Sequence, residues 1–200
     1  MFYDSRTNEH GLPHDPFKAL VAPRPIGWIS SKGPDGVSNL APYSFFNAIS
    51  SQPNLVMFSS NGRKDSLTNV AASGEFACSL VSYDLKDAMN RSSAPVGADV
   101  SEFELAGLTE APCKLIDVSY VAEAPGALEC RVLEILPLSK YDGIDTGYEM
   151  VLGEVLGIHI RDEFIEDGLV VASRLNLLAR LGYMDYSSAG DVFSLDRPKS

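Results

Sequence analysis

The sequence predicts a mainly β protein, built as a largely antiparallel barrel with a few added helices. Short β-prone runs recur between turn signals along the 200 residues. Two longer runs, 128–138 and 150–160, flank a Gly- and Asp-bearing turn at 142–147, which is typical of a long hairpin. No GxGxxG or GxxxxGK pattern follows any run, so the usual signature of a parallel nucleotide-binding sheet is absent.

The length and composition favour a single domain spanning residues 1–200. Hydrophobic residues make up 45% of the chain, and a chain of this size can bury well over half of its unfolded surface in one core. Segment 92–112 is rich in Ser, Ala, Gly and acidic residues and starts no new apolar period. We therefore expect it to be an excursion around the barrel, not a linker.

The formal net charge of −11 argues against nucleic acid or an anionic membrane as a partner, because charges of the same sign repel at long range. Residues 1–16 are polar and lack the apolar stretch of a signal peptide. No apolar run approaches the roughly 20 residues that span a bilayer. We therefore expect a cytoplasmic protein with no nucleic-acid or membrane partner.

The remaining periodic runs predict short strands at 26–31, 37–41, 54–60 and 76–81. A turn at 33–36 joins the first two strands as a hairpin. A short helix of weak amphipathic character is expected at 84–91, and leucines that would pack on the sheet predict a helix at 174–181. A third helix is expected after the loop at 61–64, with Asp65 as its cap and Gly74 at its end.

The basic loop in segment 59–69 is a candidate phosphate site, because it leads from a predicted strand into a predicted helix. Free N–H groups at a helix start carry partial positive charge, and Arg63 and Lys64 add two full charges. The hydroxyls of Ser59 and Ser66 can donate further hydrogen bonds. A capped helix with a solvated Arg and Lys explains the same residues equally well.

Two aromatic segments, 23–31 and 39–50, form a candidate site for a flat heterocycle. They place aromatic rings near small residues and exposed amides, which suits the isoalloxazine ring of a flavin. Side chains that can add hydrogen bonds are Asn39, Ser44 and Asn47. The alternative is that these aromatic residues fill the barrel, as most buried aromatic residues do; they are Trp28, Tyr43, Phe45 and Phe46.

Other kinds of site have little support. The cysteines are odd in number and form no CxxC pair, which favours idle or buried thiols over disulfides or zinc; they are Cys78, Cys113 and Cys130. No pair among His10, His14 and His159 has metal-ligand spacing, so no metal is expected, although His159 could contact a ligand. No GxSxG pattern supports a hydrolase.

Several segments taken in order resemble the flavin-reductase-like domain family: PRPIGWIS, NLAPYSFFNAIS, QPNLVMFSS, KDSLTN and GEF, and later EFELAGL, LEC, LGEVLGIHI and RLGYMDY. The resemblance covers nearly the whole chain. It implies a six-stranded Greek-key split β-barrel of the FMN-binding type with a few added helices. It also implies a homodimer that binds FMN in a groove at or near the subunit interface.

The resemblance also implies site residues. Those expected beside the flavin ring are Gly27, Trp28, Asn39, Ala41, Pro42, Tyr43, Ser44, Phe45, Phe46 and Asn47. Those expected in the loop that holds the phosphate are Ser59, Ser60, Arg63, Lys64, Asp65, Ser66 and Asn69. His159 and Arg180 match site residues of the family more loosely. The family usually has Thr at Ser66 and commonly a second Gly at Tyr183, so the flavin rim or the interface is expected to differ at Tyr183.

The implied function is an NAD(P)H-dependent flavin reductase that passes hydride from a nicotinamide to the flavin and feeds a monooxygenase. The cofactor does the chemistry in such enzymes, so no catalytic side chain is expected. One alternative is a non-enzymatic, flavoredoxin-like FMN electron carrier that is served by a redox-protein partner. Another is a barrel that has lost its flavin. The sequence does not decide whether the electron donor is NADH or NADPH. It also does not decide whether FMN is a tightly bound group or a substrate that exchanges.

Overall fold

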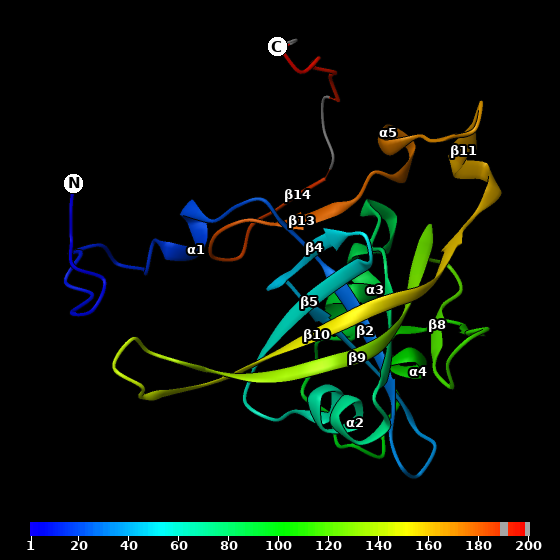
Figure 1. The fold of residues 1–200 in the computed structure, drawn as a ribbon, viewed down its shortest axis with the longest axis horizontal. Helices are drawn as coiled ribbons and strands as arrows, with labels where there is room; N and C mark the ends of the chain where they lie inside the picture. The colour runs from blue at the N-terminus through cyan, green and yellow to red at the C-terminus, as the bar shows by residue number, and fades with distance from the viewer. Residues whose placement is uncertain (189–191, 199–200) are drawn as a thin grey trace.

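The computed structural model describes residues 1–188 and 192–198. Its centre is a seven-stranded antiparallel sheet in the order β3-β2-β6-β9-β10-β5-β4, which curls into a barrel (Figure 1). The prediction of a mainly β, largely antiparallel protein is confirmed. The strands are β2 (Gly27–Lys32), β3 (Ser38–Tyr43), β4 (Phe46–Ser51), β5 (Asn54–Asn61), β6 (Glu75–Ser79), β9 (Gly126–Ser139) and β10 (Asp145–Ile160).

The two edge strands of this sheet, β3 and β4, are separated in the chain only by Ser44 and Phe45. Such a connection spans at most about 10 Å, so the opposite edges of the sheet must approach each other. The N–H of Ser59 on β5 donates to the carbonyl of Phe45 at 2.9 Å and fixes this passage. The sheet has seven strands instead of the expected six, because the passage divides residues 38–51 into two strands with different neighbours.

The core lies on both faces of β2, because successive side chains of a strand point to opposite sides. Ile29 packs with Phe58 and Phe76 in a fully buried cluster between the sheet and α2 (Asp65–Ser73). Trp28 packs on the other side, in a cluster that contains Phe103 of α4 (Glu102–Ala106) and residues of α3 (Lys86–Arg91). The helices therefore cover the two ends of the apolar interior.

Both predicted hairpins are present. β2 pairs with β3 across the turn at 33–36, where the N–H of Gly33 donates to the carbonyl of Val37 at 2.9 Å. β9 and β10 form the longest pair of strands, and their hairpin extends beyond the barrel (Figure 1). The strand predicted at 54–60 corresponds to β5, and the one predicted at 76–81 is formed as β6 and ends at Ser79.

The helix predicted from Asp65 to Gly74 is formed, but Asp65 is not its cap. Asp65 is the first helical residue of α2, the N-cap is Lys64, and no side chain caps the helix. Gly74 ends the helix as expected, in the left-handed conformation with φ 72°, and its N–H donates to the carbonyl of Val70. The helix predicted at 84–91 is a 3₁₀ turn, η1 (Tyr83–Leu85), followed by α3.

The helix predicted at 174–181 is wrong. A short helix, α5 (Ala172–Leu175), ends at Asn176, which has a left-handed conformation with φ 43°. The following residues form β13 (Leu178–Arg180), which pairs with β1 (Arg24–Pro25) on one side and β14 (Tyr186–Ser188) on the other. Backbone pairing with two strands overrides the helical spacing of the leucines.

The remaining elements are short and lie around the barrel. They are α1 (Phe17–Leu20), β7 (Glu110–Pro112), β8 (Ser119–Val121), η2 (Asp162–Phe164), β11 (Ile165–Glu166) and β12 (Leu169–Val170). Segment 92–112, expected to be an excursion, contains α4 and β7. Across residues 1–188 and 192–198, every helix is too short or too polar to cross a membrane.

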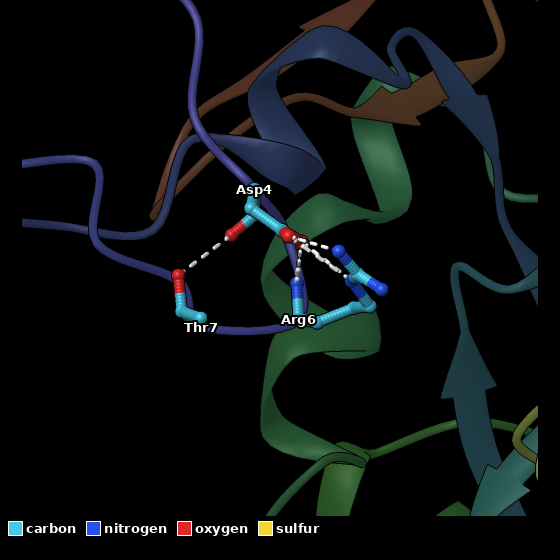
Figure 2. A network of polar contacts seen from close by, with 3 residues as sticks. All are labelled: Asp4, Arg6 and Thr7. Atoms are coloured by element: carbon cyan, nitrogen blue, oxygen red, sulfur yellow. Dashed lines mark hydrogen bonds and ion pairs between the residues drawn. The ribbon is translucent and has the colours of Figure 1, made fainter.

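The N-terminal residues lie to one side of the barrel, where Asp4, Arg6 and Thr7 contact one another (Figures 1 and 2). Asp4 forms an ion pair with Arg6 and also accepts a hydrogen bond from the Arg6 N–H at 2.9 Å. The hydroxyl of Thr7 donates to the carbonyl of Asp4 (Figure 2). Such exposed pairs contribute little to stability, so this segment adds little to the barrel.

Gly153 of β10 provides a test of the core packing. A Cβ atom at this position would lie 2.5 Å from Cζ of Phe76, which is fully buried. We expect Gly153→Ala to lower the free energy of unfolding by about 1–3 kcal/mol, because the rigid ring must shift. Denaturant unfolding measures the change.

A matched control is Gly97→Ala, where the added Cβ meets only the end of the Asp99 side chain. This variant should unfold close to the wild type. Equal unfolding midpoints for the two variants would contradict the close packing of Gly153 against Phe76.

Candidate functional site

A pocket of about 560 Å³ lies where the two edges of the sheet approach each other. Its walls come from the end of β3, the passage to β4, the end of β5, the start of α2 and the loop 92–96 that follows α3. Many of the residues predicted for flavin binding line it: Asn39, Ala41, Pro42, Tyr43, Ser44, Phe45, Ser59, Lys64, Asp65 and Ser66.

One end of the pocket is the start of α2. The first internal hydrogen bond of this helix runs from the N–H of Thr68 to the carbonyl of Lys64, at 2.9 Å. Among residues 1–188 and 192–198, no acceptor pairs with the three N–H groups before it, those of residues 65–67. Lys64 adds a full charge beside them. An uncapped helix start next to a lysine is suited to binding an anion.

Arg63 lies outside the pocket, although it is adjacent to Lys64 in the sequence. Its guanidinium donates to both carboxylate oxygens of Glu149, through Nε at 2.8 Å and Nη2 at 3.0 Å. Arg63 holds the pKa of Glu149 below its usual value. The two cations of the predicted phosphate loop therefore differ: Lys64 faces the pocket, and Arg63 neutralises an acid on β10.

A buried polar network forms the floor of the pocket around Asn39. Its Nδ2 donates to the carboxylate of Glu102 at 3.0 Å, and its Oδ1 accepts the hydroxyl of Ser66 at 2.6 Å. The N–H of Leu40 also donates to Glu102, at 2.9 Å. Burial raises the pKa of Glu102, and these hydrogen bonds oppose the rise. The Ser66 hydroxyl is thus already used as a donor.

The other end of the pocket is aromatic. Tyr43 packs on Phe58 with ring centroids 5.0 Å apart, and Phe45 packs against Tyr148 of β10 at 6.2 Å. The hydroxyl of Tyr43 is buried and has no partner among the described residues. Because an unpaired buried hydroxyl is unfavourable, it is a candidate hydrogen-bonding group for a ligand.

Trp28 lies behind the pocket wall instead of lining it. The ring is fully buried, and its Nε1 donates to Oγ of Ser92 at 2.9 Å. Ser92 in turn donates to the carbonyl of Met89 at 2.8 Å and begins the loop 92–96 that lines the pocket. The tryptophan therefore acts as a support that fixes this loop.

The other predicted residues near the pocket have structural contacts. A Cβ on Gly27 would lie 2.5 Å from Phe46, so these two residues pack together behind the ring end. Asn47 is exposed on the edge strand β4. The hydroxyl of Ser60 donates to the carbonyl of Gly62, and the amide of Asn69 donates weakly to Ser31 in the buried network.

The structure does not bring His159 to the pocket. Its Nε2 lies 2.5 Å from Oε1 of Glu129, and its ring stacks on Tyr120 with centroids 4.3 Å apart. Burial acts to raise the pKa of Glu129, but the N–H groups of Lys114 and Leu115 and the contact with His159 lower it on balance. This cluster anchors the segment around 114–120 to the barrel.

Arg180 lines a neighbouring pocket of about 370 Å³, which shares Pro42, Ser44 and Ser93 with the first pocket. Tyr183 lines the same neighbour and has a left-handed conformation with φ 54°. Glycine adopts this conformation without strain, which is a physical reason for a glycine at the position of Tyr183.

Sequence reasoning missed the residues that reach the pocket from distant segments. These are the loop 92–96, Glu102 and Tyr148; Asn61 also lines the pocket, but it lies in the predicted segment 59–69. Glu102 is one of several acids in a segment that was expected to be an excursion, and only the fold reveals that it is buried against Asn39. Tyr148 directly follows the turn at 142–147, which has no local binding signal.

The described residues form no site for metal or thiol chemistry at the pocket. Within residues 1–188 and 192–198, no group of three or more His, Cys, Asp or Glu side chains is arranged to hold a metal ion. The cysteines are free thiols, and burial raises the pKa of Cys78 to about 12. None of the three cysteines lines the pocket. The site instead combines an anion-binding end with an aromatic end.

Comparison with known proteins identifies the family. The model of the flavin reductase like domain matches residues 20–176. The chain belongs to this family. An uncharacterised protein of Halalkalibacterium halodurans, 34% identical over 183 residues, is a relative within it; the match covers 89% of this chain and 87% of that protein.

Solved structures of this flavin-reductase-like fold agree with the assignment. Nitrilotriacetate monooxygenase component B from Bacillus cereus superposes with a TM-score of 0.87 and 29% identity, over 98% of each chain. A Shewanella frigidimarina protein with a split barrel domain gives a TM-score of 0.82 at 20% identity, over 98% of this chain and 94% of that one. The predicted split-barrel fold and family are thus confirmed.

The hydrogen bond from Trp28 to Ser92 provides a test of how the pocket wall is held. Ser92→Ala leaves the buried indole N–H without an acceptor, so we expect a loss of about 1–3 kcal/mol in the free energy of unfolding. Denaturant unfolding measures it. Ser93→Ala is the matched control, because Ser93 is exposed and its hydroxyl only donates to the carbonyl of Asn90. Similar losses in both variants would contradict the supporting role of Trp28.

Proposed function

We propose that this protein binds FMN in the pocket and acts as an NAD(P)H:flavin oxidoreductase. The observation that carries the proposal is that the uncapped start of α2, with Lys64, opens into the same pocket as Tyr43 and Phe45. A flavin mononucleotide has a phosphate at one end and a flat ring at the other. A small pocket that offers both features suits such a cofactor.

The residues at the phosphate end fit this ligand. Lys64 and the free N–H groups of residues 65–67 supply positive charge and donors, and Ser59 lines the same end. Two acids, Asp65 and Glu102, line the pocket as well, and the Glu102 carboxylate accepts hydrogen bonds from Asn39 and Leu40. The Ser66 hydroxyl donates to Oδ1 of Asn39 and positions that side chain.

The residues at the ring end fit the isoalloxazine. The segment from Ala41 to Phe45 offers the backbone edge at the end of β3, and the Tyr43 hydroxyl is free to hydrogen-bond a polar edge of the ring. Phe45 and Tyr148 provide apolar surface. Trp28 acts indirectly, through Ser92 and the loop 92–96.

The chemistry that bound FMN supplies is the acceptance of hydride from a nicotinamide and the onward transfer of electrons. The protein's side chains place and orient the two ligands and exclude water. No side chain is assigned as a general acid, base or nucleophile. None of the three cysteines lines the pocket, so no thiol is assigned a part in the electron transfer.

The acceptor of the electrons is proposed to be a separate monooxygenase. The likeness to nitrilotriacetate monooxygenase component B supports this, since that protein is by name one component of a monooxygenase. A homodimer remains part of the proposal, as the family resemblance implies. The net charge of −11 favours a partner surface that carries compensating positive charge.

An anaerobic nucleotide titration tests the function directly. We expect purified protein to bind FMN and to lose its visible flavin absorption rapidly when NADH or NADPH is added without oxygen. Flavin-bound protein that ignores both nucleotides but accepts electrons from a redox protein would show an electron carrier instead. Protein that fails to bind added FMN would refute both readings.

The adjacent cations Arg63 and Lys64 provide a test of the phosphate end, because each substitution removes one positive charge. Lys64→Ala should weaken FMN binding by about 1–3 kcal/mol, the typical contribution of a hydrogen bond to a charged group. Arg63→Ala should have a smaller effect, because Arg63 is held by Glu149 outside the pocket. Fluorescence titration with FMN compares the two. A larger effect for Arg63 would place the phosphate elsewhere.

A further inference from the structure

The pocket next to the proposed flavin site has an unusual charge. It has a volume of about 370 Å³ and is lined by three cationic side chains, Lys18, Arg24 and Arg180. No acidic side chain of the described residues lines it. Acidic residues outnumber basic ones by 27 to 16 in this chain, so composition alone does not explain a pocket whose charged lining residues are all cations.

Arg24 is a buried cation without an acidic partner. It is 7% exposed, and its Nη atoms donate to the backbone carbonyls of Lys18, Val21 and Leu181. Its Nε is buried and has no acceptor among residues 1–188 and 192–198. Burial, and then the charge of Arg180, lower the pKa of Arg24. The positive charge is therefore held in place by carbonyl groups but is not neutralised.

Arg180 is the more accessible cation of the pair. Its guanidinium lies over the ring of Tyr186, 4.3 Å from the centroid, and Nη2 donates to the carbonyl of Tyr183 at 2.5 Å. It forms no ion pair within the described part of the chain, whereas Arg63, Arg131, Arg161 and Arg174 each pair with a glutamate. Two neighbouring unpaired guanidinium groups repel each other, and an anion between them would relieve that repulsion.

We propose that this pocket binds the phosphate groups of the nicotinamide nucleotide that donates the hydride. Arg180 and Lys18 would contact the phosphates, and Arg24 would act as a fixed charge behind them. The identity of the nucleotide rests on the function proposed above. The cationic lining by itself indicates a phosphate-bearing ligand, whatever its other end is.

The position of the pocket supports this assignment. Pro42, Ser44 and Ser93 line both this pocket and the proposed flavin pocket, so the two pockets are adjacent. A dinucleotide with its phosphates beside Arg180 would therefore lie next to the proposed flavin site. The flavin phosphate is assigned to a different place, the start of α2, so the two anionic groups do not compete for the same cations.

The test uses FMN-loaded protein and adenosine 5′-diphosphate, a probe that carries two phosphates but no nicotinamide. We expect the wild type to bind the probe and Arg180→Ala to bind it about tenfold or more weakly, as for the loss of one charge-assisted hydrogen bond. The KM for the nucleotide should rise by a similar factor, with kcat and FMN affinity unchanged. Calorimetry and steady-state kinetics measure these quantities.

Two further variants make the test specific. Arg174→Ala removes the same charge from an exposed ion pair with Glu166, so it should behave as the wild type. Arg180→Lys keeps the charge but loses the planar fork, and its affinity should lie between those of the wild type and Arg180→Ala. It also keeps the test decisive if the alanine variant does not fold.

The outcomes separate this proposal from the proposed function. Wild-type protein that does not bind the probe, or Arg180 variants that bind it as well as the wild type, would overturn the phosphate site even if NADH or NADPH reduces the flavin. Conversely, probe binding that depends on Arg180, in a protein whose flavin neither nucleotide reduces, would keep the site and refute the reductase.

Discussion

The short passage from β3 to β4 is the constraint on which the rest of the structure depends. Two residues, Ser44 and Phe45, carry the chain between the opposite edges of a seven-stranded sheet. The edges must therefore approach each other, and the hydrogen bond from Ser59 to Phe45 holds them. This brings the end of β3 beside the end of β5 and the start of α2. The pocket is a direct result of how the barrel closes.

The parts of the fold that the sequence predicted are those governed by local conformation. Gly74 ends α2 because it adopts a left-handed conformation, and the β9–β10 hairpin follows from two long runs around a Gly- and Asp-bearing turn. The helix expected at 174–181 is wrong although leucine is a good helix former, because local preference is weak against tertiary pairing. Its state is decided by pairing of β13 with β1 and β14, and β1 is more than 150 residues away in the chain.

The sequence predicted which segments form the candidate site, but it did not predict which contacts their side chains make. Arg63 and Lys64 look equivalent in the sequence, and the difference between them comes from Glu149, 86 residues away. The role of Ser66 also depends on a distant partner, because its hydroxyl donates to Asn39. No local pattern distinguishes Glu102 from other acids, and its role comes from its contact with Asn39. A motif gives the residue types, whereas the partners that each side chain acquires on folding decide its role.

The distribution of unpaired cations explains how so acidic a protein could hold two anionic ligands. A net charge of −11 repels FMN and nicotinamide nucleotides at long range, so their capture must depend on local positive charge. Near the pocket, Glu149 is neutralised by Arg63, and Glu102 is held by Asn39 and Leu40. Lys64 supplies the positive charge at the start of α2, where the acidic Asp65 also lines the pocket. On the other side of the end of β3, Arg180 lines the neighbouring pocket without an acid. Lys64 and Arg180 thus lie in two different pockets, which favours two ligands whose phosphates are apart and whose rings are together. Hydride transfer requires that arrangement of the two rings.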